Sequence, residues 1–221
     1  MVLTKIRVII ADDHDILRRG LIQVLEEEDD ISVVGEAKNG NEAIKLVAKM
    51  QCDVLLLDIS MPGKSGLEVI KIVCNDNQKL PILILSMHRE DQYAVRCLKA
   101  GACGYLSKQS ASTELVKAIR TVAKGKKYIS AEVAQILANN VNVSEDKPIH
   151  ELLSNREFQT LTMIGSGLTV TEISEKLALS VKTVSVYRAR LLEKMKLRNN
   201  SDLMNYAIKK NLVNQEEQLS K

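Results

Sequence analysis

Five short apolar runs in the first part of the chain show no alternation between apolar and polar residues. They are Ile6–Ala11, Ile31–Ala37, Val54–Asp58, Ile82–Ser86 and Gly104–Leu106. The first four are rich in Val, Ile and Leu, which is typical of strands that are buried on both faces. Such strands occur in parallel sheets that helices cover on both sides, so this pattern predicts a parallel sheet.

The segments between these runs carry apolar residues at helical spacing, for example Leu21 and Leu25, or Leu115 and Ile119. This alternation of strands and helices predicts a doubly wound α/β fold of the flavodoxin-like kind, with a five-stranded parallel sheet in the order 2-1-3-4-5. Each apolar run is far too short to span a bilayer.

The pattern changes after residue 124. Ser130 can cap a short helix that ends near Leu137, and a polar stretch rich in turn formers follows at 139–148. From Ser154 onward only helical patterns remain, so we expect a small all-α domain. The predicted limits are 3–124 for the α/β domain, 125–147 for a linker with a short helix, and 148–212 for the all-α domain.

The composition is that of a globular protein, because 45% of the 221 residues are hydrophobic and 27% are charged. The N-terminus reaches Asp12 before any long apolar stretch, so we expect no signal peptide. The four cysteines form no CxxC pair, which favours reduced thiols over a zinc site or a disulfide framework. We therefore expect a cytoplasmic protein with no membrane partner.

Polar side chains follow four of the predicted strands. Asp12 and Asp13 follow the first strand, Asp58 ends the third, Ser86 ends the fourth, and Lys108 lies just after the fifth. In an open parallel sheet, ligands bind at the carboxyl ends of the strands. These four strands are neighbours in the expected order, so the three carboxylates, the hydroxyl and the ammonium should converge at one edge.

This combination suits phosphoryl transfer to a carboxylate. Clustered carboxylates need a cation, and Mg²⁺ binds carboxylates together with a phosphate. Asp58 is the candidate nucleophile, because a carboxylate can attack phosphorus to give an aspartyl phosphate. Asp13 would bind the metal directly and Asp12 directly or through water, while Lys108 and Ser86 would hold the phosphoryl oxygens. The alternative is that these acids are ordinary loop residues.

Residues 3–124 resemble a response-regulator receiver domain. The resemblance is carried by the motifs Val8–His14, Leu55–Gly63 and Gly101–Lys108. It implies that a sensor histidine kinase phosphorylates Asp58, and that the protein is a regulator and not an enzyme.

The same resemblance extends the candidate site. It implies Mg²⁺ or Mn²⁺ as the cofactor. It also implies that the Ser86 hydroxyl and the Tyr105 ring form the pair of residues that switches position on phosphorylation. We interpret His14, which follows the acid pair, as a loop or helix-capping residue. The implied metal ligands are Asp12, Asp13, Asp58 and the backbone carbonyl of Ser60.

The second domain contains a basic segment. Residues 176–198 hold seven basic side chains and one acidic side chain, which indicates either a polyanion partner or a solvated helix face. A helix capped by Thr169 or Thr171 should end at Leu177. After a short turn, Ser180 caps a second helix over 181–195. Two helices joined by a tight turn match a helix-turn-helix, whose second helix enters the major groove of double-stranded DNA.

Residues 148–212 resemble the LuxR-type DNA-binding domain, on motifs that include Leu153–Glu157 and Leu179–Val184. Many relatives have Lys and His where this chain has Ser185 and Tyr187, so the resemblance fixes the docking mode and not the bases that are read. By position, we expect a row of side chains on the second helix to face DNA. They are Lys182, Thr183, Ser185, Val186, Arg188, Ala189 and Arg190.

Together, the two domains resemble a NarL/FixJ-type response regulator, and most of all the GacA/UvrY/LetA subgroup. That subgroup implies a tripartite sensor kinase partner and regulation of small regulatory RNA genes. The resemblance to LuxR-type domains implies a homodimer on inverted-repeat half-sites, formed through the last helix at about 201–210. The alternative is that the apolar residues of this helix all belong to the core. Met204 and Ile208 lie one turn apart on that helix and are the candidate dimer contacts.

Two other functions fit parts of the sequence. A Mg²⁺-dependent phosphohydrolase could also use Asp58 as its nucleophile, but it would need a general acid at position 60, where this chain has Ser, and a cap domain. A receiver that acts by protein contact alone would have no use for the basic helix at 181–195.

Overall fold

The computed structural model describes residues 5–76, 80–87, 90–141 and 148–213. The chain divides into two compact units, Met1–Asn142 and Val143–Lys221, with the division inside the segment that the sequence marks as a linker. Within the described ranges, no helix is long and apolar enough to cross a membrane.

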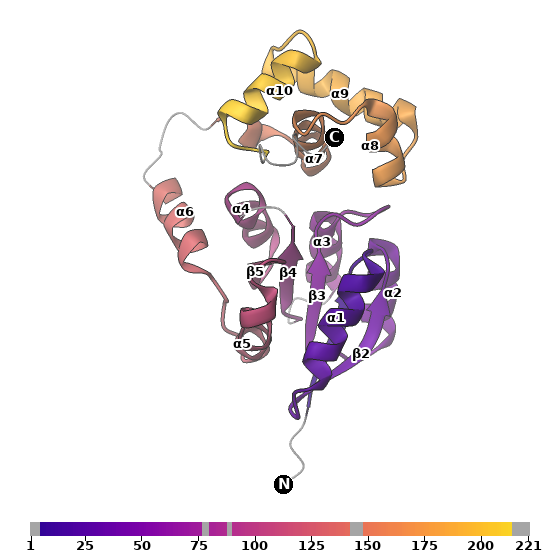
Figure 1. Ribbon diagram of the computed structural model, residues 1–221, viewed down its shortest axis with the longest axis vertical. Coiled ribbons are helices and arrows are strands. Elements are labelled where there is room, and N and C mark those ends of the chain that lie inside the picture. The colour runs from indigo at the N-terminus through magenta and orange to yellow at the C-terminus, as the bar shows by residue number, and fades with distance from the viewer. Residues whose placement is uncertain (1–4, 77–79, 88–89, 142–147, 214–221) are drawn as a thin grey trace. The chain divides into compact units, whose positions relative to one another are not determined.

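The first unit is built on a five-stranded sheet in which every neighbouring pair is parallel. The strand order is β2-β1-β3-β4-β5, so the predicted doubly wound fold is confirmed (Figure 1). The strands are β1 (Ile6–Ala11), β2 (Ile31–Ala37), β3 (Val54–Asp58), β4 (Ile82–Ser86) and β5 (Gly104–Ser107).

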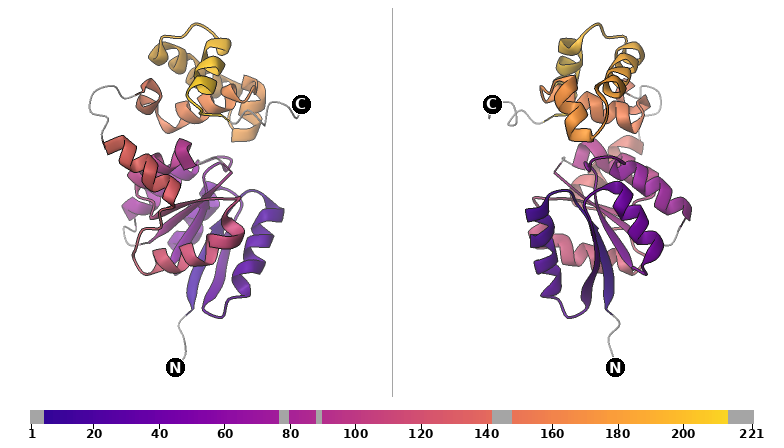
Figure 2. Two further views of the ribbon diagram at one scale, coloured as in Figure 1. Left: turned by 60° about the vertical axis from the view of Figure 1, so that its left-hand side comes forward. Right: turned by 90° about the vertical axis from the view of Figure 1, so that its right-hand side faces the viewer.

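Helices cover both faces of this sheet, as Figure 2 shows. On one face, Leu25 of α1 and Ile119 of α5 belong to a single apolar cluster with Val8, Leu56 and Leu83 of the strands. The other face carries α2, α3 and α4, which contact one another in that order. The helices are α1 (Asp15–Glu26), α2 (Gly40–Lys49), α3 (Gly66–Asp76), α4 (Glu90–Ala100), α5 (Ala111–Ala123) and α6 (Ala131–Val141).

The strand register places the predicted polar residues at one edge. Ala11 pairs with Leu57, and Asp58 pairs with Leu85, so the residues after β1 and at the end of β3 are neighbours. Ser86 pairs with Ser107, one residue before Lys108. The side chains that are far apart in the sequence therefore meet at the carboxyl end of the sheet.

The segment after α5 stays with the first unit. Tyr128 forms an isolated parallel bridge to Gly104 of β5, and α6 packs against α4. Ser130 caps this helix by accepting a hydrogen bond from the Val133 amide, but the helix runs to Val141, beyond the predicted end at Leu137.

The second unit is helical throughout its described part and is built around α7, which contacts α8, α9 and α10. Its core contains Phe158, Leu161, Ile173, Val184 and Leu203, each 1% exposed or less. The elements are the 3-10 helix η1 (Ile149–Leu152) and the helices α7 (Asn155–Gly165), α8 (Val170–Leu177), α9 (Val181–Met195) and α10 (Asn200–Lys209).

Candidate functional site

The centre of the acidic site is a buried ammonium between two buried carboxylates. Lys108 Nζ lies 2.7 Å from Asp12 Oδ2 and 2.9 Å from Asp58 Oδ2. Each of these three side chains is only 2% exposed. The structure therefore brings together three residues whose association the sequence predicted from strand order alone.

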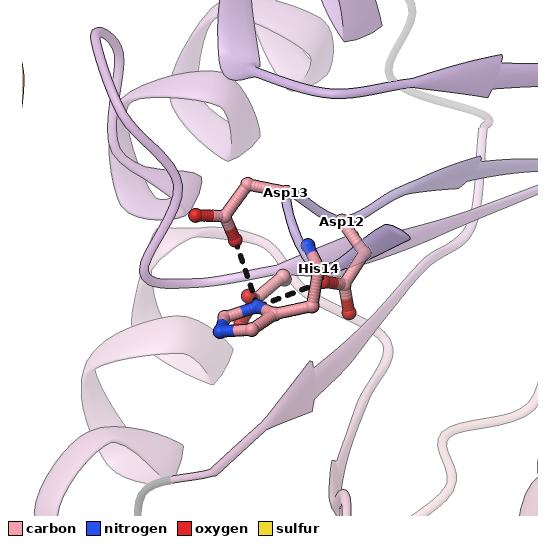
Figure 3. Close-up of side chains that lie close together, drawn as sticks. Asp12, Asp13 and His14 are labelled. Atoms are coloured by element: carbon pink, nitrogen blue, oxygen red, sulfur yellow. Dashed lines mark hydrogen bonds and ion pairs between the residues drawn. The ribbon is translucent and has the colours of Figure 1, made fainter. Parts of the chain in front are cut away.

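Asp13 and His14 lie close to Asp12 (Figure 3), and their side chains are more exposed than that of Asp12. His14 Nδ1 lies 3.0 Å from Asp13 Oδ1 and 3.2 Å from Asp12 Oδ1. His14 occupies the N-cap position of α1, but its side chain makes no capping hydrogen bond. The expected position at the helix start is therefore correct, but the imidazole contacts the acid pair instead of capping the helix.

The charges of the site are unbalanced without a further cation. Three carboxylates face one ammonium, which leaves two negative charges when all four groups are ionised. Burial raises the pKa of Asp58, and nearby Asp12 adds to this effect, although Lys108 opposes it. Burial acts to lower the pKa of Lys108, but Asp58 and Asp12 outweigh it, so that pKa is raised and the ammonium stays charged.

A divalent metal fits this arrangement. Among the described residues, Asp12 Oδ2 and Asp13 Oδ1 are buried oxygens that accept no hydrogen bond of good geometry, despite their short contacts with Lys108 and His14. One potential ligand atom each from Asp12, Asp13, His14 and Asp58 lies within 4.8 Å of the others. Hard carboxylate oxygens suit Mg²⁺ or Mn²⁺. The Ser60 amide donates to Asp58 Oδ1 at 3.3 Å, which places Ser60 beside the site, while its carbonyl as a metal ligand stays a prediction.

The candidate switch residues are both buried. Ser86 is 0% exposed, and its carbonyl accepts a hydrogen bond from the Lys108 amide at 2.8 Å. Tyr105 is 1% exposed, so its ring lies inside the first unit. Their role as a switch pair stays a prediction.

Gly66 is a residue of the site that the sequence analysis missed. It begins α3, and a Cβ atom added there would lie 2.7 Å from the Asp58 carbonyl oxygen and 2.7 Å from Ile59 Cα. Only glycine lets α3 approach the backbone of the acceptor strand this closely. A lone glycine in the sequence offers no signal of such a contact.

In the second unit, α8 and α9 form the predicted helix-turn-helix. Thr169, and not Thr171, caps α8 in a reciprocal capping box with Glu172. Ala178 ends α8 in the left-handed conformation, with φ of 51°. Ser180 then caps α9 by accepting a hydrogen bond from the Thr183 amide at 3.0 Å.

The candidate DNA-facing residues differ in exposure. An exposed row on α9 is formed by Lys182, Ser185, Val186, Ala189 and Arg190, while Thr183 and Arg188 are only partly exposed. Arg188 Nε donates a hydrogen bond to Asn200 Oδ1 at the start of α10. The row is thus suited to meet a partner directly, whereas Arg188 is also bound within the unit.

The last helix has a buried and a partly exposed side. It begins at Asn200, one residue before the expected start, and is capped by Asn199. Leu203 and Ala207 are fully buried, whereas Met204 and Ile208 are partly exposed. The Tyr206 hydroxyl lies 2.9 Å from His150 Nδ1, which joins the helix to η1.

Two family models match the chain. Residues 8–120 match the response regulator receiver domain, and residues 151–207 match the bacterial regulatory proteins of the luxR family. Two similar curated proteins are the response regulator UvrY of Escherichia coli (strain K12) and the response regulator GacA of Pseudomonas viridiflava. UvrY is 39% identical over 96% of this chain and 97% of its own length. GacA is 37% identical over 94% and 98%.

The solved structures agree with these matches. RcsB from Salmonella enterica serovar Typhimurium, bound to the promoter rprA in the presence of phosphomimetic BeF3−, is 30% identical, with a TM-score of 0.64 over 92% of this chain and 98% of that chain. These relatives are transcription regulators and not enzymes, so the phosphohydrolase alternative is set aside. The chain therefore belongs to the response regulators that join a receiver domain to a LuxR-type DNA-binding domain.

Proposed function

We propose that this protein accepts a phosphoryl group on Asp58 from a sensor histidine kinase and then regulates transcription as a homodimer on DNA. Small regulatory RNA genes are the proposed targets, which the resemblance to the GacA/UvrY/LetA subgroup implies. The proposed functional limits are 3–124 for the receiver, 125–147 for the linker and 148–212 for the DNA-binding domain.

One observation carries the receiver half of this proposal. The Lys108 ammonium lies within hydrogen-bond reach of both Asp12 and Asp58, and all three side chains are buried. A purely structural ion pair needs one carboxylate, whereas this cluster keeps an excess of negative charge at considerable desolvation cost. Such an arrangement supports phosphoryl transfer, in which a cation and a lysine neutralise the charge of the incoming group.

The chemical step follows from these positions. An Asp58 carboxylate oxygen forms a bond to phosphorus, and the bond between phosphorus and the donor breaks, so the donor leaves with the electron pair. When bound to Asp12, Asp13, Asp58 and the Ser60 carbonyl, Mg²⁺ would neutralise charge on the phosphoryl oxygens. Lys108 would then turn from the carboxylates to a phosphoryl oxygen, and the Ser86 hydroxyl would donate to another.

The DNA half of the proposal rests on α9. Its exposed row presents Lys182 and Arg190 together with the short side chains Ser185 and Ala189. Basic side chains neutralise phosphates, and short side chains near a helix start can approach base edges. Dimerisation through Met204 and Ile208 would place two such helices on a two-fold axis, which suits an inverted repeat with half-sites about one helical turn apart.

The experiment is labelling of the full chain by acetyl phosphate with Mg²⁺, followed by intact-mass measurement. Wild type should gain one phosphoryl group, and Asp58→Asn should gain none. Asp53→Asn is the matched control, because Asp53 also lies beside β3 but is bound to Arg7 at the opposite end of the sheet, and it should label as wild type does. Labelling of Asp58→Asn at the wild-type rate would overturn the proposal.

A further inference from the structure

Arg18 is a buried arginine on α1 that binds three different parts of the first unit. Its Nη1 donates to the backbone carbonyl of Asp12 at 2.8 Å, and its Nε donates to Glu36 Oε2 at 3.0 Å. Its Nη2 donates to Asp15 Oδ1 on the first turn of α1. The side chain is only 5% exposed, so one guanidinium joins the end of β1, the end of β2 and the start of α1.

The contact with Asp12 is the informative one. The Asp12 carbonyl belongs to the peptide that joins Asp12 to Asp13, and both side chains belong to the acidic site. A hydrogen bond to this carbonyl restricts the rotation of that peptide. The guanidinium is planar and is held by two further acceptors, so the direction of its hydrogen bond to the Asp12 carbonyl is fixed. A flexible lysine ammonium would not fix this direction.

Two other arginines of the same unit provide a contrast. Arg7 binds Asp53 at the opposite end of β1, and Arg120 binds Glu28 and Asp30. Both arginine side chains are 39% exposed. Asp53, Glu28 and Asp30 lie outside the acidic site, so these pairs serve to join elements at the surface.

We propose that Arg18 is a positioning residue for the metal site, which presets the Asp12–Asp13 peptide so that both carboxylates face the cation before it binds. This inference rests on the proposed function. Without the guanidinium, the peptide could rotate, and part of the binding free energy of the cation would be spent on ordering it. The loss should therefore appear in Mg²⁺ affinity and not in the chemical step, which Arg18 does not contact.

The test is a calorimetric Mg²⁺ titration of the full chain. Arg18→Met should raise the Kd by about tenfold to a hundredfold, the range seen when a side chain that orients a metal ligand is removed. Arg18→Lys should give a smaller increase, because one ammonium cannot hold all three acceptors. Arg7→Met is the matched control and should leave the Kd within about twofold, since exposed ion pairs contribute little.

A second readout separates positioning from general loosening of the fold. The rate of labelling by acetyl phosphate at saturating Mg²⁺ should return to near the wild-type value in Arg18→Met, while the Mg²⁺ concentration for half-maximal rate should rise with the Kd. If Arg18→Met does not fold, Glu36→Gln removes the negative charge of one carboxylate that holds Arg18 and should still raise the Kd several-fold.

An unchanged Kd in Arg18→Met, or in Glu36→Gln if only that variant folds, would overturn the inference, as would an equal rise in Arg7→Met. These outcomes leave the proposed function intact as long as wild type binds Mg²⁺ and is labelled. Failure of wild type itself to bind Mg²⁺ would instead count against the proposed function.

Discussion

The acidic site of the first unit and the exposed row on α9 gather their polar side chains in different ways. In the first unit, Asp12, Asp58 and Lys108 come from three separate strand ends and are buried around a shared contact. On α9, Lys182 and Arg190 belong to one helix and are exposed along one side of it. The first arrangement depends on the whole sheet, and the second depends on one helix and its caps.

This difference indicates how each region should respond to change. In the buried site the charges interact strongly with one another, because little water screens them. A single substitution should therefore change metal binding, chemistry and stability together. On α9 the side chains are screened by solvent, and each should contribute a separate and smaller part of DNA affinity.

The largest effect is expected at Asp13. Asp13→Ala removes a carboxylate that belongs to the acidic site without removing the acceptor Asp58. The Kd for Mg²⁺ should rise on the order of a hundredfold, at the upper end of the range for residues that support a metal, and labelling at limiting Mg²⁺ should fall with it. A Mg²⁺ titration checks this, and an unchanged Kd would remove Asp13 from the ligand set.

A smaller effect is expected for dimer formation on DNA. Met204→Glu places a charge on the partly exposed side of α10 and leaves the buried Leu203 and Ala207 unchanged. Affinity for DNA with two half-sites should fall about tenfold or more, whereas affinity for one half-site should change little. Paired titrations on the two DNAs measure this, with circular dichroism to check folding. Equal losses on both DNAs would place the dimer contact elsewhere.

Arg190 and Arg188 test whether the α9 side chains act separately. Arg190→Ala should weaken binding similarly for all DNA sequences and reduce the salt slope by about one, as for one lost phosphate contact. Arg188→Ala should also lower stability, because Arg188 is hydrogen-bonded to Asn200. Asn200→Ala is the control that removes this bond and keeps both arginines. Wild-type affinity and salt slope in Arg190→Ala would exclude Arg190 from the interface.

The smallest expected effect is on the pH dependence of stability. It distinguishes two buried acids, Asp58 and Glu157, whose pKa values are shifted in opposite directions. The pKa of Asp58 is raised by burial and by Asp12. Burial also acts to raise the pKa of Glu157, but its hydrogen bonds with Lys194 and the Ser154 amide outweigh this, so that pKa is lowered. A raised pKa in the folded state gives stability that is lost as pH rises, and a lowered pKa gives stability that is lost as pH falls.

Without Mg²⁺ at pH 7, Asp58→Asn should therefore be more stable than wild type by about 1 kcal/mol, and this gain should shrink as pH falls toward about 4. Glu157→Gln should be less stable by about 1 kcal/mol at pH 7, and this loss should persist down to the unfolded pKa of about 4.3 and shrink only below it. Urea unfolding at several pH values measures both differences. The same sign for both variants would contradict the contrast between the two units.

The sequence predicted what depends on strand order and helix periodicity. The sequence placed Asp58, Ser86 and Lys108 at the carboxyl ends of predicted strands. In a parallel sheet all carboxyl ends lie at the same edge, so neighbouring strands bring these residues together there. The helix-turn-helix followed from the cap at Ser180 and the apolar spacing of α9. These features depend on local patterns and on one rule of topology.

The contacts of Arg18, Gly66 and His14 could not be predicted in this way. Arg18 binds Glu36 through a contact between two elements, and its sequence position gives no direction for the guanidinium. Gly66 is needed only because α3 approaches the backbone of Asp58. His14 had the right position for a cap, but its imidazole contacts the acid pair. Each depends on tertiary packing that periodicity does not contain.

The most direct test of the account asks whether the acidic site controls the exposed row on α9. Binding of the full chain to an inverted-repeat promoter DNA would be titrated with and without acetyl phosphate and Mg²⁺, for wild type and for Asp58→Asn. We expect acetyl phosphate to tighten binding by wild type and to leave binding by Asp58→Asn unchanged. An equal response of both proteins, or no response of wild type despite full labelling of Asp58, would contradict it.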